Sequence, residues 1–422
     1  MAKTLSRKNS LETPALPVDE ALRKILEKIA PIGKELISLK TAAGRILASD
    51  IRAKHDLPHF DNSTMDGYAV RAEDLKQAHA ERPVQLQVRQ VLPAGSSKGR
   101  KVNPGEAARI MTGAALPPGA DAIVMQEQSE AIEGHVLVRH RPPSGELIRA
   151  RGEDVRAGDV ILREGARLRP YELALLAAQG IGRVEVYRRP TVAVLSTGDE
   201  LCDSSMRPSA GRVRDANRPA ILGALGLWGA LGVDLGLASD EPKAIAAKLQ
   251  TGLARADALV VSGGVSVGQF DHTRAVFAKL GIETVFWRVR IKPGKPFLFG
   301  LRRRGRGAPQ PVFGLPGNPV SSLVCLEELV RPALDRMQGY SPLERPYRLT
   351  GRTTNGFDLP LGRRQYLFCE AAPLGKGYAL RILRPQASHR VGMCVKANAL
   401  AFPPDGMRRV RPGGSLPFRW LE

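Results

Sequence analysis

Apolar residues recur along the chain with two different periods, and the change of period marks the predicted elements. Residues 18–32 carry apolar side chains at three- and four-residue spacing, which predicts an amphipathic helix. Weaker helical patterns cover residues 42–48 and 171–179. In contrast, residues 84–88 and 135–138 are short β-rich runs between Gly and Pro turns, which predicts strands.

From residue 190 onward, predicted strands and helices alternate, which favours a parallel sheet covered by helices on both faces. The predicted strands are residues 192–195, 233–237, 258–261, 289–291 and 312–313. The predicted helices lie near residues 219–231, 242–253, 273–280 and 320–337. After about residue 342 the pattern becomes β-rich again and remains so to the end.

These changes of pattern predict a multidomain protein of α/β and β classes, with a doubly wound α/β domain. A chain of 422 residues exceeds what one hydrophobic core usually serves, and roughly two to four domains are expected. The predicted division is a disordered tail (1–17), a discontinuous helical domain I (18–58 and 155–189), an inserted β-rich domain II (59–154), an α/β domain III (190–340) and a C-terminal β domain IV (343–422).

The composition and charge favour a cytoplasmic protein. Residues 1–17 lack the apolar run of a signal peptide, and no stretch has the roughly 20 apolar residues that cross a bilayer. The four cysteines lack the paired spacing of a disulfide framework or zinc site. The net charge of +21 is scattered, and its densest run, residues 302–306, is interpreted as a solvated hairpin loop. We therefore expect no nucleic-acid partner and no membrane.

Candidate chemistry follows the predicted strands, because ligands of open α/β sheets bind beyond the carboxyl ends of the strands. Five polar or Gly-rich loops occupy those positions: residues 196–200, 239–242, 262–268, 292–296 and 314–319. Glu200 and Asp240 suit a divalent cation such as Mg²⁺. Lys292 and Lys295 supply positive charge for a phosphate or another oxyanion. Taken singly, a Gly-rich loop is more often a plain turn, and Asp240 alone could simply cap the following helix. It is the agreement of the five loops that predicts a site for a metal-bridged phosphate ester or oxyanion.

Several runs, in this order, closely resemble the molybdopterin molybdenumtransferase family, which includes bacterial MoeA and the E domain of gephyrin. The resemblance extends from about residue 18 to residue 422. The runs are residues 61–71 (DNSTMDGYAVR), 109–114 (RIMTGA), 151–154 (RGED), 196–201 (STGDEL), 262–268 (SGGVSVG), 291–296 (IKPGKP) and 315–319 (LPGNP).

The resemblance implies a fold of four domains and a homodimer whose active site is shared between subunits. The implied reaction converts adenylylated molybdopterin and molybdate into molybdenum cofactor and AMP, with Mg²⁺ as cofactor. The implied substrate donor is a molybdopterin adenylyltransferase.

Matching positions imply the site residues. Those expected to be catalytic are Asp66, Thr112, Asp154, Glu200, Asp240, Lys292 and Lys295, with Glu200 and Asp240 also holding the metal. Those expected to bind the pterin substrate are Ser262, Gly263, Gly264, Ser266, Gly268, Asp271, Pro316, Gly317, Asn318, Pro319 and Ser388. The hypothesis is that Asp66 of the other subunit orients molybdate or the attacking oxygen.

The C-terminal domain departs from the family pattern. The family usually has Gly-Arg-x-acid-aromatic-x-Arg, whereas residues 362–368 read GRRQYLF, and residues 386–389 read QASH in place of Gln-Gly-Ser. The contacts of this domain therefore stay open. Two alternatives also stay open: a non-catalytic pterin-binding or scaffold protein, and a paralogue that handles tungstate, which closely matches molybdate in size and charge.

Overall fold

The computed structural model describes residues 14–96, 99–264, 272–305, 307–341, 347 and 349–421. The predicted site residues Ser266, Gly268 and Asp271 lie outside this part, as does most of the predicted tail. The chain forms two compact units. The first comprises residues 1–48, 165–168 and 184–422, and the second comprises residues 49–164 and 169–183. The finer division into four domains stays a prediction.

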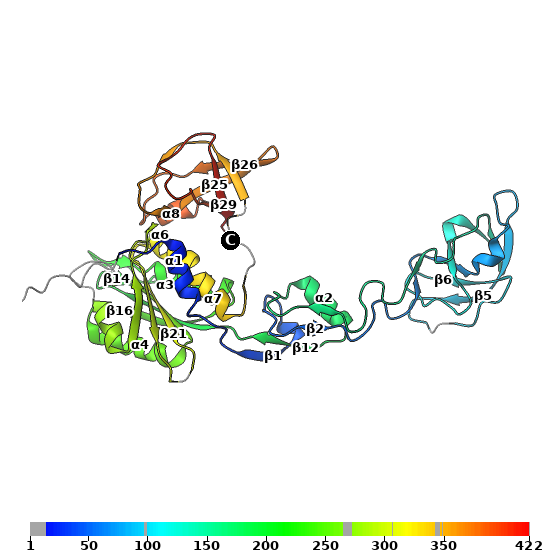
Figure 1. Ribbon diagram of the computed structural model, residues 1–422, viewed down its shortest axis with the longest axis horizontal. Coiled ribbons are helices and arrows are strands. Elements are labelled where there is room, and N and C mark those ends of the chain that lie inside the picture. The colour runs from blue at the N-terminus through cyan, green and yellow to red at the C-terminus, as the bar shows by residue number, and fades with distance from the viewer. Residues whose placement is uncertain are drawn as a thin grey trace, which may run out of the picture. The chain divides into compact units, whose positions relative to one another are not determined.

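A six-stranded sheet forms the centre of the first unit (Figure 1). Its order is β16 (Leu231–Ala238), β13 (Thr191–Thr197), β17 (Ala258–Ser262), β21 (Gln310–Leu315), β20 (Leu298–Arg302) and β18 (Ile282–Trp287). The first four strands are parallel, as predicted, but β20 is antiparallel to both of its neighbours. The sheet is therefore mixed, and β18 ends at the same edge as the four parallel strands.

Helices cover both faces of this sheet because alternate residues of the buried strands point to opposite sides. Val192 and Val194 of β13 pack with α1 (Val18–Leu26), α3 (Asn217–Leu227), α6 (Pro319–Cys325) and α7 (Arg331–Met337). Ala193 and Leu195 pack on the other side with α4 (Pro242–Arg255) and α5 (His272–Lys279). The doubly wound α/β prediction is confirmed.

The predicted strand at residues 289–291 is wrong as a member of this sheet. Ile291 and Lys292 form a short strand, β19, that pairs in parallel with β24 (Arg364–Gln365) from the C-terminal region. The apolar residues Val289 and Ile291 are buried, and a local hydrophobic pattern detects that burial. The strand that pairs with β19, however, is more than 70 positions away in the sequence. Local periodicity carries no information about such a partner.

The Arg-rich run lies in the hairpin between β20 and β21, as predicted. It is more than a solvated loop, because Arg304 Nη2 donates hydrogen bonds to the carbonyls of Leu253 (3.2 Å) and Ala256 at the end of α4. Gln310 Nε2 donates to the same two carbonyls, at 3.3 and 2.7 Å. These side chains satisfy acceptors that a helix end leaves unpaired.

The predicted C-terminal β domain is a closed barrel, hereafter the C-terminal barrel. Its strands are β22 (Leu349–Thr353), β26 (Gly377–Ile382), β25 (Leu367–Leu374), β27 (Ala399–Ala401) and β29 (Ser415–Trp420). Its core includes Leu380 and Phe418, both fully buried. Closure leaves no unpaired sheet edge to be covered.

The second unit contains another six-stranded sheet, which the β-rich pattern predicted. Its order is β7 (Ala122–Met125), β4 (Gly67–Val70), β6 (Glu106–Ile110), β5 (Val84–Leu92), β9 (His135–Val138) and β8 (Ser129–Ile132). Helix α2 (Pro170–Ala178) belongs to this unit and matches the pattern at residues 171–179.

The predicted helix at residues 42–48 is wrong. Gly44 adopts a positive φ of 74°, and Ile46 and Leu47 form antiparallel bridges with Arg167 and Val186. Nearby, β1 (Lys34–Ser38) pairs with β12 (Arg183–Tyr187). Segments before and after the insertion therefore pair as β-structure within the first unit, and the discontinuous helical domain stays a prediction.

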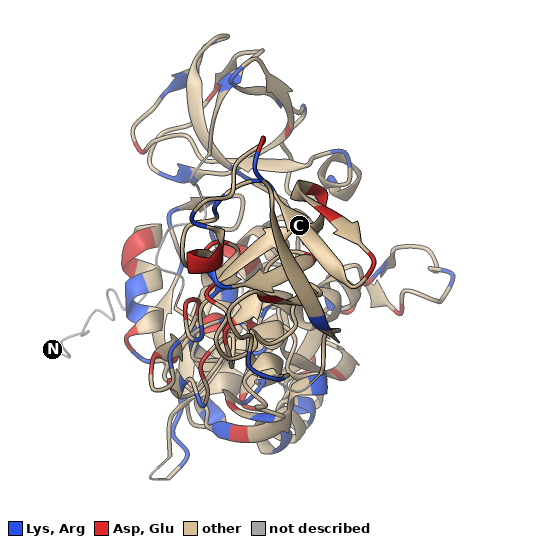
Figure 2. Cartoon of the chain, turned by 90° about the vertical axis from the view of Figure 1, so that its right-hand side faces the viewer, with Lys and Arg blue, Asp and Glu red and all other residues tan. Residues whose placement is uncertain are grey.

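Basic and acidic residues are scattered over many elements (Figure 2). Of the helices that the structure describes, none is both long enough and apolar enough to span a membrane.

Two glycines with the same backbone conformation test how tightly the first unit is packed. Gly339 (φ 71°) would place a Cβ 2.1 Å from Tyr187 Cδ2, whereas Gly281 (φ 72°) has nothing within 4 Å of that position. We expect Gly281→Ala to lower the free energy of unfolding by about 1–2 kcal/mol through backbone strain. Gly339→Ala should lose about 1–3 kcal/mol more through overpacking. Denaturant unfolding measures both, and equal losses would contradict the packing.

Candidate functional site

The ends of the central strands meet through the backbone at Gly263. Its N–H donates to Leu315 O at 3.1 Å, and its φ is 92°. A Cβ here would lie 2.2 Å from Thr197 O, so no side chain fits between β13 and β17. A Cβ on Gly317 would lie 4.0 Å from Gly263 Cα. The predicted loops that carry Ser262, Gly263, Pro316 and Gly317 therefore converge.

A buried polar network lies behind these loops. Asp215 accepts hydrogen bonds from Ser196 Oγ (3.1 Å) and from the backbone N–H groups of Asn217 and Arg218 (both 3.1 Å). Asn217 Nδ2 then donates to Ser262 Oγ at 2.6 Å and to Gly317 O at 2.7 Å. This network fixes the ends of β13, β17 and β21 relative to one another.

Three buried polar atoms around the same turn have no hydrogen-bond partner in the part of the chain that the structure describes. They are Thr197 Oγ1, Asn217 Oδ1 and Thr273 Oγ1. Gly264 lies among them, because a Cβ at this position would be 2.2 Å from Thr273 Oγ1 and 3.0 Å from Thr197 Oγ1. Buried polar atoms in proteins are nearly always paired with protein, water or ligand. The turn therefore has capacity for a polar ligand.

Carboxylates gather at the ends of β13 and β16. Asp199 N–H donates to Asp240 Oδ2 at 3.4 Å, and Asp240 N–H donates to Asp199 Oδ1 at 3.1 Å. The Glu200 carboxylate folds back toward Gly198, where a Cβ would lie 2.6 Å from Glu200 Oε2. The loops that follow β16, β13, β17 and β21 form one edge of the central sheet, hereafter the rim. The predicted pair Glu200 and Asp240 thus lies at one end of the rim, with Asp199 beside it.

These carboxylates can serve as part of a metal site. Oxygen donors from one or two carboxylates suit Mg²⁺, which keeps other positions for water and substrate phosphate oxygens. No group of three or more His, Cys, Asp or Glu side chains that could hold a metal ion occurs among the described residues. The donor set therefore fits Mg²⁺ only when water and a bound substrate supply the remaining ligands.

The two predicted lysines line a cavity of about 420 Å³, hereafter the oxyanion cavity. Lys292 lies in β19, Lys295 lies in the loop that follows it, and Asn318 immediately precedes α6, whereas Ser388 lies between β26 and β27 in the C-terminal part of the chain. Ser388 O also accepts the N–H of Val320 at 3.1 Å, at the start of α6. The sequence thus predicted four residues that the structure brings together around one cavity.

Other residues of this cavity were not predicted as site residues. They come from the segments in which the sequence departs from the family pattern: Arg363, Gln365, Tyr366, Gln386 and His389. The sequence feature that could have identified this side of the cavity is Gly362-Arg363, because these two residues match the start of the family pattern. The unpredicted residues make part of the wall cationic and polar, and apolar residues such as Phe357, Phe368 and Met393 line the rest. Burial, together with the charge of Arg363, lowers the pKa of Lys292.

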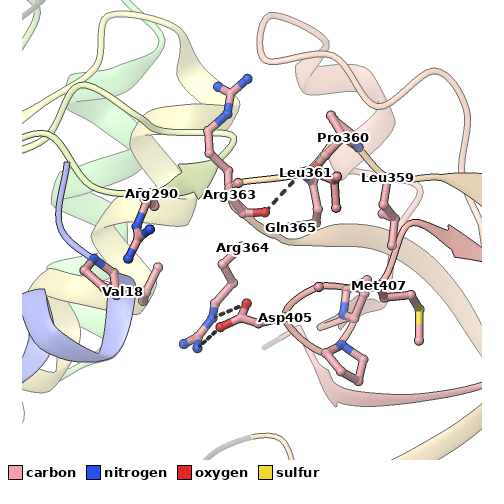
Figure 3. Close-up of a pocket in the computed structure, with 15 residues that line it drawn as sticks. Val18, Arg290, Leu359, Pro360, Leu361, Arg363, Arg364, Gln365, Asp405 and Met407 are labelled. Atoms are coloured by element: carbon pink, nitrogen blue, oxygen red, sulfur yellow. Dashed lines mark hydrogen bonds and ion pairs between the residues drawn. The ribbon is translucent and has the colours of Figure 1, made fainter. Parts of the chain in front are cut away.

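A second cavity, of about 260 Å³, lies between the start of α1 and the C-terminal barrel (Figure 3). Arg364 is neutralised there, because its guanidinium binds Asp19 at 2.7 Å and Asp405 at 2.8 Å. Figure 3 shows Arg363 pointing away from this ion-pair cluster. Arg363 and Gln365 line both cavities, so β24 separates them.

Asp66 and Thr112 are paired in the second unit. Asp66 Oδ1 accepts hydrogen bonds from Thr112 N and Thr112 Oγ1, both at 2.7 Å. The Thr112 backbone N–H, then its hydroxyl, lowers the pKa of Asp66. The carboxylate therefore stays ionised at neutral pH, available as an acceptor or a base.

Asp154 is not joined to this pair. Its N–H donates to Leu57 O at 3.1 Å, and its side chain is exposed. Within the described residues no hydrogen bond or ion pair links Asp154 with Asp66 or Thr112, and none links the rim carboxylates with Lys292 or Lys295.

Comparison with known proteins gives the same family over most of the chain. Residues 16–180 match the model of the MoeA N-terminal region (domain I and II), and residues 193–336 match that of a "probable molybdopterin binding domain". A molybdopterin molybdenumtransferase of Haemophilus influenzae is 40% identical over 353 residues, which cover 83% of this chain and 85% of the relative. The Nostoc molybdopterin molybdenumtransferase is 35% identical over 383 residues, 90% of this chain and 87% of the relative.

Solved structures agree. The crystal structure of a molybdopterin biosynthesis MoeA protein from Pyrococcus horikoshii has a TM-score of 0.82 and 29% identity, covering 97% of this chain and 100% of that one. Another structure of MoeA from this organism has a TM-score of 0.78 and 33% identity, covering 97% and 99% of the two chains. In sequence and in fold, this chain belongs to the MoeA family of molybdopterin molybdenumtransferases.

Proposed function

We propose that this protein is a molybdopterin molybdenumtransferase, which uses molybdate and adenylylated molybdopterin to form molybdenum cofactor and releases AMP. The observation that carries the proposal is the oxyanion cavity. Lys292 and Lys295 supply positive charge, and Asn318 and Ser388 supply neutral hydrogen-bond donors. Molybdate is a compact tetrahedral dianion at neutral pH, and its charge and acceptor oxygens match such a wall.

The Gly-rich turn is the proposed position of the pterin nucleotide. Gly263 and Gly264 leave no side chain between a ligand and the backbone, and the buried hydroxyls of Thr197 and Thr273 lack partners within the described part of the chain. Backbone N–H groups and hydroxyls at a strand end are a common setting for phosphate. Asn217 would support this position by fixing Ser262 and Gly317.

Glu200 and Asp240 are the proposed ligands of Mg²⁺, with Asp199 beside them. A bound Mg²⁺ would neutralise charge on the phosphoanhydride that links AMP to the pterin. Lys292 and Lys295 would bind and orient the oxyanion. The turn at Gly263 and Gly264 would hold the phosphates against the backbone.

The enzyme is proposed to act in the cytoplasm as a homodimer, with Asp66 of the partner subunit completing each site. The support is that Asp66 is held ionised by Thr112, as an orienting acceptor requires, in a unit distinct from the one that carries the rim. A molybdopterin adenylyltransferase would supply the substrate. Handling of tungstate remains the second candidate, since the cavity selects by charge and size.

The proposed Mg²⁺ ligands, Glu200 and Asp240, can be tested by substitution. In a single-turnover assay with adenylylated molybdopterin, molybdate and Mg²⁺, we expect Glu200→Gln and Asp240→Asn to slow AMP release about 100-fold or more, because developing charge is no longer neutralised. EDTA should abolish the wild-type reaction and added Mg²⁺ should restore it. Glu241→Gln, an exposed acid next to Asp240, is the matched control.

Wild-type rates in Glu200→Gln and Asp240→Asn would exclude these two residues as Mg²⁺ ligands. If the wild-type protein binds the pterin but releases no AMP, the result would favour the non-catalytic scaffold protein.

The second prediction concerns the oxyanion cavity. Lys292→Gln and Lys295→Gln should each weaken molybdate binding about tenfold, the effect of losing a hydrogen bond to a charged group. Since the pKa of Lys292 is lowered, wild-type affinity should fall as pH rises through that pKa, below the range of an ordinary lysine. Lys292→Gln should remove this dependence. Calorimetric titration with molybdate and with tungstate measures both effects, and exposed Lys243→Gln is the control. Unchanged affinity in the cavity variants would disprove the assignment.

The third prediction tests the shared site. Asp66→Asn should lower kcat more than it raises KM, because the carboxylate acts after binding. If Asp66 and Glu200 of one site come from different subunits, co-expressed Asp66→Asn and Glu200→Gln chains should regain about a quarter of wild-type activity, since half the dimers are mixed and hold one intact site. Co-expression that restores nothing would place both residues in one subunit's site.

A further inference from the structure

The oxyanion cavity is lined by cations and by no acid. Lys292, Lys295 and Arg363 supply the positive charge, and none of the lining residues in the described part of the chain is an Asp or a Glu. Within that part, no ion pair joins any of the three cations to an acid. Arg364, the next residue after Arg363, is by contrast neutralised by two aspartates. The charge of the oxyanion cavity is therefore left for a ligand.

Gln365 places a neutral side chain beside these cations. It is 5% exposed and lines the oxyanion cavity. In the parallel ladder of β19 and β24 it pairs with Lys292. Side chains of paired residues lie on the same face of a sheet, with their Cβ atoms about 5 Å apart. A charge at position 365 would therefore act directly on the Lys292 ammonium group.

The hydrogen bonds of Gln365 fix the orientation of its amide. Its Nε2 donates to Pro360 O at 3.1 Å and to Arg363 O at 3.3 Å. Both partners are carbonyl oxygens, which only accept, so the amide nitrogen must face them. The amide therefore holds the turn before β24 and leaves Lys292 charged. A carboxylate in its place would lose both hydrogen bonds and would be available to Lys292 instead.

Gln365 is one of two positions at which residues 362–368 depart from the family pattern. An acid is usual here, and an Arg is usual where Phe368, another lining residue, stands. An acid within reach of Lys292 would form an ion pair with it and compete with a bound anion for the same ammonium group. The neutral amide removes that competition. Burial and the charge of Arg363 lower the pKa of Lys292, as expected for a lysine without an acidic partner.

We propose that Gln365 sets the charge selectivity of the oxyanion cavity, so that a tetrahedral dianion binds in preference to a monoanion of the same shape. This proposal rests on the proposed function. Its physical basis is that the Coulomb energy is proportional to the charge of the ligand, and Gln365 leaves the full positive charge of the cavity uncompensated. Gln365 thus determines specificity by remaining uncharged.

Tungstate and perrhenate test this proposal, because they are tetrahedral oxyanions of closely similar size that carry two charges and one charge, respectively. Calorimetric titration of the full-length protein with each anion gives the ratio of the two affinities. We expect the wild type to favour tungstate. Gln365→Glu should weaken tungstate binding about tenfold and perrhenate binding only about threefold, because an added negative charge repels a dianion with twice the energy.

Gln365→Met separates the effect of charge from that of hydrogen bonding. It loses the hydrogen bonds to Pro360 O and Arg363 O but adds no charge, so it should lower the unfolding midpoint and keep the wild-type ratio of affinities. Gln250→Glu, on the exposed surface of α4, adds the same charge outside the cavity and should change neither affinity. Gln365→Lys should shift the ratio in the opposite direction, so either charged variant that folds decides the question.

Equal weakening of tungstate and perrhenate binding by Gln365→Glu would overturn the charge role, and so would a change of the ratio in Gln365→Met. Either result would leave the transferase itself intact, as AMP release by the wild type would show. A wild-type protein that neither binds molybdate nor releases AMP would overturn the proposed function, and this proposal with it.

Discussion

The buried carboxylate of Asp215 holds the ends of three central strands in register. It is 2% exposed, and it binds the Ser196 hydroxyl, two backbone N–H groups and the guanidinium of Arg218. Arg218 also binds Asp203 at 2.6 Å and contacts Asp234 on the edge strand β16. A buried charge is stable only when its partners are complete, so this group of side chains persists or fails as one. The glycine turn depends on it through the hydrogen bonds of Asn217 to Ser262 and Gly317.

Because this buried network fixes the backbone of the glycine turn, few side chains of the rim itself are needed to hold the turn in place. Close approach at Gly263 excludes a Cβ, and the fixed backbone supplies the shape of the turn. A site made mainly of backbone and small polar groups has to be held in position by buried side chains behind it. Pre-organisation of this kind costs stability elsewhere but removes the need to rearrange when an anion binds.

Local patterns identified most of the elements, because alternation and helical spacing report burial. They predicted β13, β16, β17 and β21 and the loops that follow them, and hence Glu200, Asp240 and Ser262 at one rim. They failed where pairing is distant: Ile291 joins β24, and Ile46 and Leu47 join segments more than 100 residues away. For the same reason the C-terminal side of the oxyanion cavity was not predicted, apart from Ser388. Nothing near Lys292 in the sequence indicates that Tyr366 lies beside it. Residues 265–271 carry predicted site residues outside the described part of the chain.

The π-helix η4 (Leu326–Val330), which joins α6 to α7, makes the length of this segment part of its structure. Each residue added to or removed from a helix rotates everything beyond it by about 100°. The wide turn at Leu326–Val330 accommodates one residue more than an α-helical turn would, and in that register the Glu328 carboxylate accepts a hydrogen bond from the Tyr347 hydroxyl at 2.8 Å. Deleting a single residue here would restore ordinary helical winding, yet it would turn the carboxylate away from the barrel. The number of residues between α6 and α7 therefore sets the direction in which Glu328 points.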